Sequence, residues 1–247
     1  APWFNDKFPI VPVPAIEADG KAFNDKMEIK LNVPFDDKVY YHVYPMHDAY
    51  KNDQWNLYDK PFAIAESAEV SFYAENNGEN SGIVKSIFFK KPNDYTIAIK
   101  SVYNKQYHAG GPEGLIDGIL GNENWRKGDW QGYQSQDFEA VIDLQKEMPV
   151  KAIKGRFLQD SRSWILMPAK VEYYISNDGK NFTLVNTVNN TIAPQDTTTQ
   201  IKSFDTELNG TKTHYIKVKA YNFGTLPQWH QGAGGEAFIF IDEITIN

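Results

Sequence analysis

The sequence contains no cysteine among its 247 residues. A chain without thiols forms no disulfides or zinc–thiolate sites and has no thiolate nucleophile. An apolar run of about 18 residues, the length that a membrane-spanning helix needs, is also missing. No basic segment followed by an apolar one opens the chain, as it would in a signal peptide. We therefore expect no membrane insertion, and the first residues do not reveal the compartment.

Basic residues are fewer than acidic residues in this sequence. Lysine and arginine number 25 against 32 aspartates and glutamates, which gives a net charge of -7 and an isoelectric point near 5.3. Nucleic acids and anionic membrane surfaces bind proteins that present a basic face. The composition therefore argues against nucleic acid as a partner.

Helical periodicity is missing as well, whereas strand patterns recur throughout the chain. Met27, Ile29, Leu31 and Val33 alternate with polar residues, which is the period of two of a half-buried strand. Similar strand patterns cover residues 39–44, 62–64, 70–74, 83–89, 138–144, 150–158, 171–176, 215–220 and 238–246. Strands that follow one another at about 8–12 residues, separated by turn signals, predict antiparallel sandwiches.

Pro92-Asn93-Asp94 interrupts the strand pattern, and we place a domain boundary there. The sequence thus predicts an all-β chain of two β-sandwich domains, residues 1–93 and 94–247. Residues 1–14, with four prolines and the aromatics Trp3, Phe4 and Phe8, are predicted to form an extended lead-in. Residues 189–199 are polar and threonine-rich, and we expect them to form a solvated loop.

A glycine-rich stretch from Gly110 to Gly118 is the most distinctive local feature. Its four glycines and one proline forbid a long helix or strand, and they deliver the carboxylate of Asp117 into a turn. Trp125 and Trp130 follow shortly afterwards. Such a loop suits a ligand or cation site. The alternative is that this segment is a tight turn leading into a sheet and that the tryptophans are buried in the core. For Trp130 we favour a position in the core.

No catalytic constellation is visible. Glu139 and Asp143 lie on one face of a strand but about 13 Å apart, too far for a pair of glycosidase carboxylates. Asp242 and Glu243 are adjacent on a strand, which predicts that they point to opposite faces. The five histidines show no metal-ligand spacing, and no serine–histidine–acid order stands out. The sequence therefore predicts a chain that is not an enzyme by itself.

Six motifs of the second domain follow one another in a familiar order. They are Leu-Ile-Asp-Gly at 115–118, Trp130, Val-Ile-Asp-Leu at 141–144, Ser-Asn-Asp-Gly at 176–179, His-Tyr-Ile-Lys-Val at 214–218 and Ile-Asp-Glu-Ile at 241–244. This series resembles the discoidin, or F5/8 type C, fold in the version used as family 32 carbohydrate-binding modules. The resemblance implies a jelly-roll, galactose-binding-like sandwich. The missing terminal disulfide points to the bacterial branch of the family.

The first domain is similar to the small Fn3- or Ig-like sandwich near the C-terminus of chitobiases and β-hexosaminidases. The segments that carry this likeness are 39–41, 57–62, 70–74 and 81–84. A sandwich of this kind followed by a discoidin-like domain resembles the C-terminal part of Bacteroidetes family 20 β-hexosaminidases. The likeness implies a non-catalytic accessory region of an extracytoplasmic bacterial enzyme, whose catalytic domain would be a partner. The alternative is a pair of spacer domains that packs on that catalytic domain and binds no sugar. Exposed apolar residues on the first domain, for which Trp3, Phe4 and Phe8 are candidates, would favour it.

The discoidin resemblance also implies a structural Ca²⁺ ion. In that fold, the Asp of the Asp-Gly turn and a Glu near the C-terminus bind the ion together with backbone carbonyls, which corresponds here to Asp117 and Glu243. A hard cation prefers such oxygen ligands, and Asn122 could add a carbonyl oxygen. The alternative is a pair of carboxylates that cap turns.

Three pairs of residues are candidates for glycan binding. Aromatic faces stack on the apolar side of pyranose rings, while neighbouring polar groups bind the hydroxyls. The pairs with this composition are Trp125–Arg126, Arg162–Trp164 and Trp229–His230. The resemblance implies a glycan that contains N-acetylhexosamine or galactose. The alternative is that these aromatics fill the interior.

Overall fold

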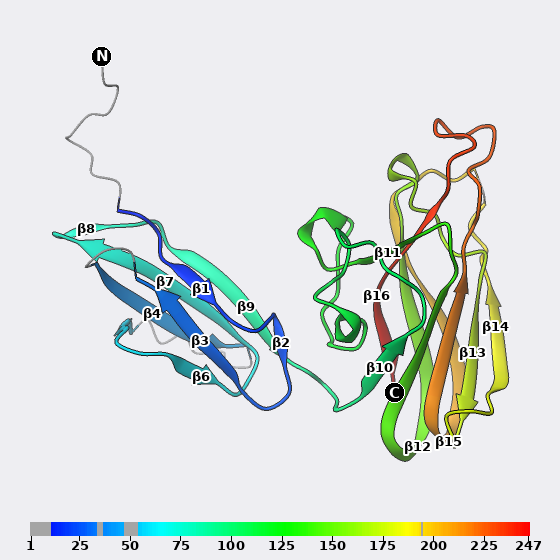
Figure 1. Cartoon of the computed structure of the whole chain (residues 1–247), viewed down its shortest axis with the longest axis horizontal. Helices are drawn as coiled ribbons and strands as arrows, with labels where there is room; N and C mark the ends of the chain where they lie inside the picture. Colours follow the sequence, from blue (N-terminus) through cyan, green and yellow to red (C-terminus); the bar gives the residue numbers. More distant parts are fainter. Residues whose placement is uncertain (1–10, 34–36, 47–53, 194) are drawn as a thin grey trace. The chain divides into compact units, whose positions relative to one another are not determined.

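The computed structural model describes residues 11–33, 37–46, 54–193 and 195–247 (Figure 1). Trp3, Phe4 and Phe8 of the predicted lead-in lie outside these ranges. The chain divides into two compact units, Ala1–Lys90 and Lys91–Asn247. Three short 3-10 helices are the only helices in the described residues, so the all-β prediction is confirmed. Nowhere in the described ranges is a helix long and apolar enough to cross a membrane.

The first unit consists of two sheets (Figure 1). One contains β1 (Ala15–Glu17), β3 (Met27–Asn32) and β6 (Phe62–Ile64). The other has the order β2 (Ala22–Phe23), β9 (Val84–Lys90), β7 (Ala68–Asn76), β4 (Lys38–Pro45) and β5 (Asn56–Leu57), with β8 (Glu79–Asn80) paired to β7. Residues of β3, β4 and β7, among them Ile29, Val39 and Phe72, share one buried core. The alternation along β3 thus places every second side chain in that core, as the sequence pattern predicts.

Two long strands organise the second unit (Figure 1). β12 (Phe138–Gln159) and β15 (Gln200–Tyr221) pair antiparallel along most of their 22 residues each. The first part of β12 also pairs with β10 (Thr96–Ile99), and its second part with β16 (Phe238–Ile246). β13 (Lys170–Ser176) and β14 (Thr183–Asn189) extend one side of the sheet, and β11 (Gln131–Gln134) extends the other. Irregular pairing near residues 143–152 separates the two parts of β12, and side chains from both parts share one apolar core.

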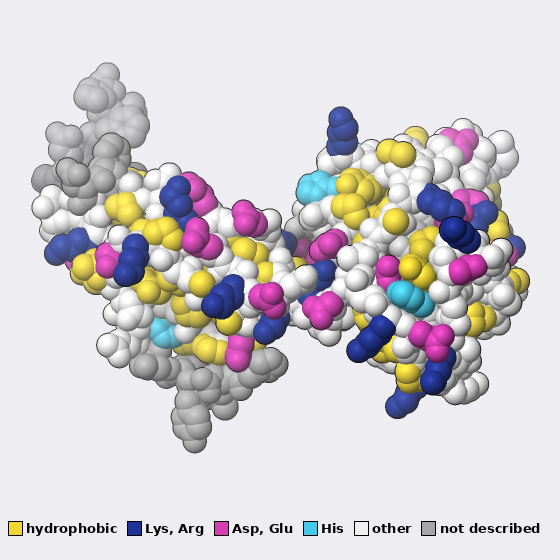
Figure 2. Space-filling view, turned by 60° about the horizontal axis from the view of Figure 1, so that its bottom comes forward, with side chains coloured by type: hydrophobic (Ala, Val, Ile, Leu, Met, Phe, Trp, Pro, Cys, Tyr) yellow, Lys and Arg dark blue, Asp and Glu magenta, His cyan; other side chains and the backbone are white. Residues whose placement is uncertain are grey.

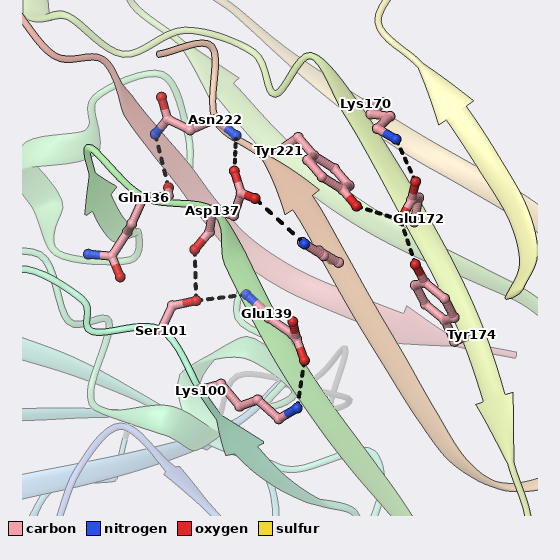
Figure 3. A network of polar contacts seen from close by, with 11 residues as sticks. Lys100, Ser101, Gln136, Asp137, Glu139, Lys170, Glu172, Tyr174, Tyr221 and Asn222 are labelled. Atoms are coloured by element: carbon pink, nitrogen blue, oxygen red, sulfur yellow. Dashed lines mark hydrogen bonds and ion pairs between the residues drawn. The ribbon is translucent and has the colours of Figure 1, made fainter. Parts of the chain in front are cut away.

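A polar network ties the strands together away from this core (Figure 3). Glu172 on β13 accepts hydrogen bonds from Lys170 Nζ at 2.6 Å, Tyr174 Oη at 2.5 Å and Tyr221 Oη at 2.8 Å. In register with Glu172 lies Lys219 on β15, which in turn lies opposite Glu139 on β12. Burial alone would raise the pKa of Glu172, but its three hydrogen-bond donors hold that pKa at about 2. The ionised carboxylate is therefore part of the folded structure.

Replacing Glu172 with glutamine is expected to lower the free energy of unfolding at pH 7 by about 1–3 kcal/mol, because charge-assisted hydrogen bonds are lost. A carboxyl whose pKa is depressed on folding stabilises the protein above its unfolded pKa, near 4.5, and loses that effect as the pH falls towards about 2. The difference between wild type and variant should therefore shrink between pH 4.5 and 2 in chemical denaturation. A difference that is constant over this range would show that the charge of Glu172 is unimportant.

Candidate glycan and cation sites

The short 3-10 helix η3 (Ser161–Ser163) lies where three loop segments of the second unit meet. Asp160 precedes it and uses Oδ2 to accept hydrogen bonds from Trp125 Nε1 at 3.0 Å and Ser163 Oγ at 2.9 Å. Asp160 thereby holds η2 (Trp125–Lys127) next to η3. The sequence analysis missed Asp160, since a single aspartate after a strand carries no signal of its own.

The loop between β15 and β16 reaches η3 through His230. The ring Nε2 of His230 lies 2.7 Å from the carbonyl oxygen of Ser161, and the backbone N–H of Gly232 donates to Nδ1 at 2.9 Å. Since Nδ1 accepts, the proton resides on Nε2, which donates to Ser161. The ring is only 5% exposed. His230 therefore holds the loop in place and has no ring nitrogen left for a sugar hydroxyl, which differs from the contact predicted for it.

Trp229 projects from the loop that His230 holds. Its side chain is 40% exposed, and its ring meets the His230 ring edge to face at 5.8 Å. Trp164 is half-buried and packs with Leu166, Leu226 and Ala237. The loop backbone lies directly on the Trp164 indole, because a Cβ atom added to Gly232 would come within 2.5 Å of Nε1. Trp164 is thus mainly an interior plug, and Trp229 offers the open aromatic surface.

Trp125 has an intermediate position. Its ring packs edge to face against Tyr107 and Phe240, and the Arg126 guanidinium lies 4.1 Å from its centroid. Arg126 and Arg162 are both exposed. Gln231 Nε2 donates to the Arg162 carbonyl at 3.2 Å, so Arg162 is adjacent to the loop of Trp229. The structure therefore gathers all six predicted residues around η3, a region that we call the η3 rim.

The second candidate site depends on a β-bulge in β16. Arg156 on β12 pairs with Glu243, and the next residue, Phe157, pairs with Ile241, so Asp242 is an extra residue. Both acids consequently reach the same loop: Asp242 Oδ2 accepts from the Gly121 N–H at 2.8 Å, and Glu243 Oε2 accepts from the Gly118 N–H at 3.1 Å. The prediction that they point to opposite faces is wrong, because regular alternation fails at a bulge.

Burial dominates the electrostatics of these acids. Asp117, Asp242 and Glu243 are 7%, 0% and 4% exposed. Burial, reinforced by the negative charge of Asp117, raises the pKa of Glu243 to about 9. Burial also raises the pKa of Asp242 to about 7, although its ion pair with Arg156 acts in the opposite direction. The structure thus brings Asp117 and Glu243 together inside the protein.

Asn122 does not join this pair. Its side chain is exposed, and its Oδ1 accepts from the backbone N–H of Asn124 at 2.9 Å within its own turn. No group of three or more His, Cys, Asp or Glu side chains suited to a metal occurs in the described ranges. Two buried carboxylates side by side still fit a cation, since its charge would offset their repulsion, and backbone carbonyls would have to complete its ligands.

Comparison with known families agrees with this architecture. The model of the F5/8 type C domain matches residues 97–236, which is more than half of the chain. The chain belongs to the F5/8 type C domain family. The family resemblance of the second domain is therefore confirmed, and the residues of the η3 rim and Asp117 lie within the matched range. No sequence among the curated proteins matched the chain.

Solved structures similar to this F5/8 type C domain include modules of bacterial glycoside hydrolases. CpGH89CBM32-5 from Clostridium perfringens, in complex with GalNAc-β-1,3-galactose, is 19% identical with a TM-score of 0.40; the match covers 62% of this chain and 94% of that one. The family 32 module of C. perfringens NanJ, in complex with galactose, is 20% identical with a TM-score of 0.38, covering 62% and 92%. The C-terminal domain of a chitobiase from Bacteroides fragilis is 20% identical with a TM-score of 0.38, covering 62% and 93%.

Proposed function

We propose that the chain is a non-catalytic accessory region of a secreted bacterial glycoside hydrolase and that its F5/8 type C domain binds a glycan at the η3 rim. The observation that carries this proposal is Trp229, a large aromatic ring exposed on a loop that buried His230 anchors to Ser161. Exposing an indole costs hydrophobic free energy, and fixing its loop gives a pyranose ring a surface prepared for stacking. The sequence motifs of both units support a family 20 β-N-acetylhexosaminidase as the parent enzyme, and they support N-acetylhexosamine- or galactose-containing glycans as ligands.

Replacing Trp229 with alanine is expected to weaken glycan binding by about 1–3 kcal/mol, the value known for aromatic stacking on bases. A shallow rim should bind with a Kd of about 0.1–1 mM, so this loss would take binding below detection. A glycan array followed by calorimetry measures the effect. Leu184→Ala is the matched control, since Leu184 is 48% exposed but lies on β14. Unchanged affinity in a folded W229A variant would refute the proposed site, and an unfolded variant would show that Trp229 supports the fold.

A second candidate function is that of a spacer that packs on the catalytic domain. The observation that favours it is exposed apolar surface on the first unit, part of which is visible in Figure 2. In the described part of the chain, five of the nine exposed large hydrophobic side chains belong to that unit: Val13, Met46, Leu57, Ile83 and Ile87. The two functions are compatible, because this surface is on the first unit and the η3 rim is on the second. Absence of binding to every glycan on the array would leave the spacer as the better interpretation.

We also propose that Asp117 and Glu243 hold a divalent cation, with Ca²⁺ as the best fit. Both side chains are buried, and the negative charge of Asp117 adds to the effect of burial in raising the pKa of Glu243 to about 9. A bound cation would let both remain ionised. It would also link the turn at Gly118 to β16, and thus hold the loop on which Trp125 begins η2.

Adding Ca²⁺ is expected to raise the melting temperature of the chain, because an ion that binds only the folded state stabilises it. A hundredfold excess over Kd corresponds to about 2.7 kcal/mol. Thermal unfolding in chelator and in millimolar Ca²⁺ measures the shift. Asp117→Asn should abolish it, whereas Asp205→Asn, which removes an exposed carboxylate from β15, should keep it. A wild-type melting temperature that is equal in both buffers would refute the cation site.

A further inference from the structure

Arginine is rare in this chain, and its placement is uneven. Only three of the 25 basic residues are arginines: Arg126, Arg156 and Arg162. The side chain of Arg156 is 22% exposed and forms an ion pair with Asp242. The other two are exposed, and both belong to the η3 rim.

Among the residues that the structure describes, neither of these two guanidinium groups forms an ion pair. Within the described residues, the ion pairs of the second unit use lysines, His214 and Arg156, but not Arg126 or Arg162. The nearest acid in sequence to Arg162 is Asp160, and its Oδ2 already accepts from Trp125 and Ser163. Each arginine therefore presents its donors to solvent.

The surroundings of the two arginines are held in place. Arg126 lies over the ring of Trp125, whose Nε1 is bound to Asp160. Arg162 lies two residues after Asp160 in the sequence. The backbone carbonyl of Arg162 accepts a hydrogen bond from Gln231, which follows Trp229 and His230 in the loop. Two exposed guanidinium groups thus belong to the η3 rim, and Arg162 is adjacent to the loop of Trp229, in a protein whose net charge is -7. On the face that Figure 2 shows, side chains of both signs are interspersed.

Guanidinium groups differ from ammonium groups in what they bind best. The planar fork donates two parallel hydrogen bonds to a carboxylate or a sulfate, and it is more weakly hydrated than lysine. We infer that the glycan bound at the η3 rim carries an anionic group, a carboxylate or a sulfate, which Arg162 and Arg126 bind while Trp229 stacks on a sugar ring. This inference rests on the proposed glycan binding and adds the charge of the ligand to it.

The test compares neutral glycans with derivatives of them that carry an anionic group, either a sulfate alone or a sialic acid residue. Lactose, 3′-sialyllactose and 3′-sulfolactose form one set, and N-acetylglucosamine with its 6-sulfate forms another; each is titrated into the whole chain by calorimetry or NMR at low salt. At least one anionic member should bind about tenfold more tightly than its neutral parent, and this advantage should shrink as ionic strength rises. The sialyl and sulfo arms distinguish a carboxylate from a sulfate.

Single variants then test which residues carry the preference. Arg162→Gln and Arg126→Gln should reduce the advantage of the anionic glycan, and Arg162→Lys should restore only part of it. Lys127→Gln, which removes the same charge next to Arg126, should leave it nearly unchanged. Neutral glycans that bind as well as the anionic ones would overturn the inference but leave the proposed function intact. Failure of every glycan to bind would overturn the proposed function itself.

Discussion

Replacing Trp130 with alanine is expected to lower the free energy of unfolding of the second unit by about 3–5 kcal/mol, the cost of emptying a large buried aromatic site. Trp130 is 1% exposed and packs with Leu158, Ile165 and Phe240. Its Nε1 also donates to the Asn122 carbonyl at 2.9 Å, so the substitution leaves that acceptor without its partner. Both losses act in the same direction.

The contacts of Trp130 give this prediction a second readout. A Cβ atom added to Gly121 would lie 2.4 Å from Nε1, so the backbone of the loop rests on the indole. That loop places Gly118 and Gly121 on Glu243 and Asp242 and continues to Trp125. We therefore expect W130A to weaken the Ca²⁺-dependent stabilisation as well. Trp130→Phe retains an aromatic ring that fills part of the site but loses the hydrogen bond, and it should cost less than W130A in urea denaturation. Equal losses for the two variants would contradict the packing argument.

The strands that face a core could be predicted from sequence because burial imposes alternation. β3, β6 and β16 match the expected ranges closely, and the turn at Asn77 and Gly78 has the positive φ angles of 49° and 84° that its residues favour. The first part of β15 was missed. Its inward residues Phe204, Thr206 and Leu208 include a threonine, and charged or polar residues lie between them, so the apolar signal is diluted.

The candidate sites were harder to predict because they depend on contacts between distant residues. The aromatic and arginine pairs of the η3 rim could be predicted from sequence. The hydrogen bonds of Asp160 and the contact of His230 with the Ser161 carbonyl, which hold the loops together at η3, could not. A β-bulge has no sequence signature of its own, so the common orientation of Asp242 and Glu243 was also hidden. Whether a histidine is exposed or buried depends on which loop covers it. The sequence around His230 therefore does not distinguish a buried histidine from an exposed one.

Replacing Arg156 with alanine is expected to cost about 3–5 kcal/mol of stability, because it leaves a buried carboxylate without its counter-charge. Asp242 is fully buried, and its Oδ1 has no hydrogen-bond partner among the described residues. The Arg156 side chain, 22% exposed, forms the ion pair and donates to the Gly121 carbonyl at 2.9 Å. Asp242→Asn should cost less, since the guanidinium that remains can reach water.

The pH dependence of this loss has a definite sign. Asp242 has a pKa of about 7 in the folded protein against an ordinary value of 3.8 in the unfolded chain, so its contribution to stability is complete below pH 3.8 and is lost as the pH rises through 7. Without Arg156 the folded pKa rises further, because the guanidinium favours the ionised form. The cost of R156A should therefore be small at pH 5, where Asp242 is protonated, and large at pH 8. Urea denaturation in chelator at both pH values measures it, with Lys154→Ala on the same strand as the matched control. A cost for R156A that is the same at pH 5 and pH 8 would show that the lost contacts of the arginine, rather than the unpaired charge of Asp242, destabilise the variant.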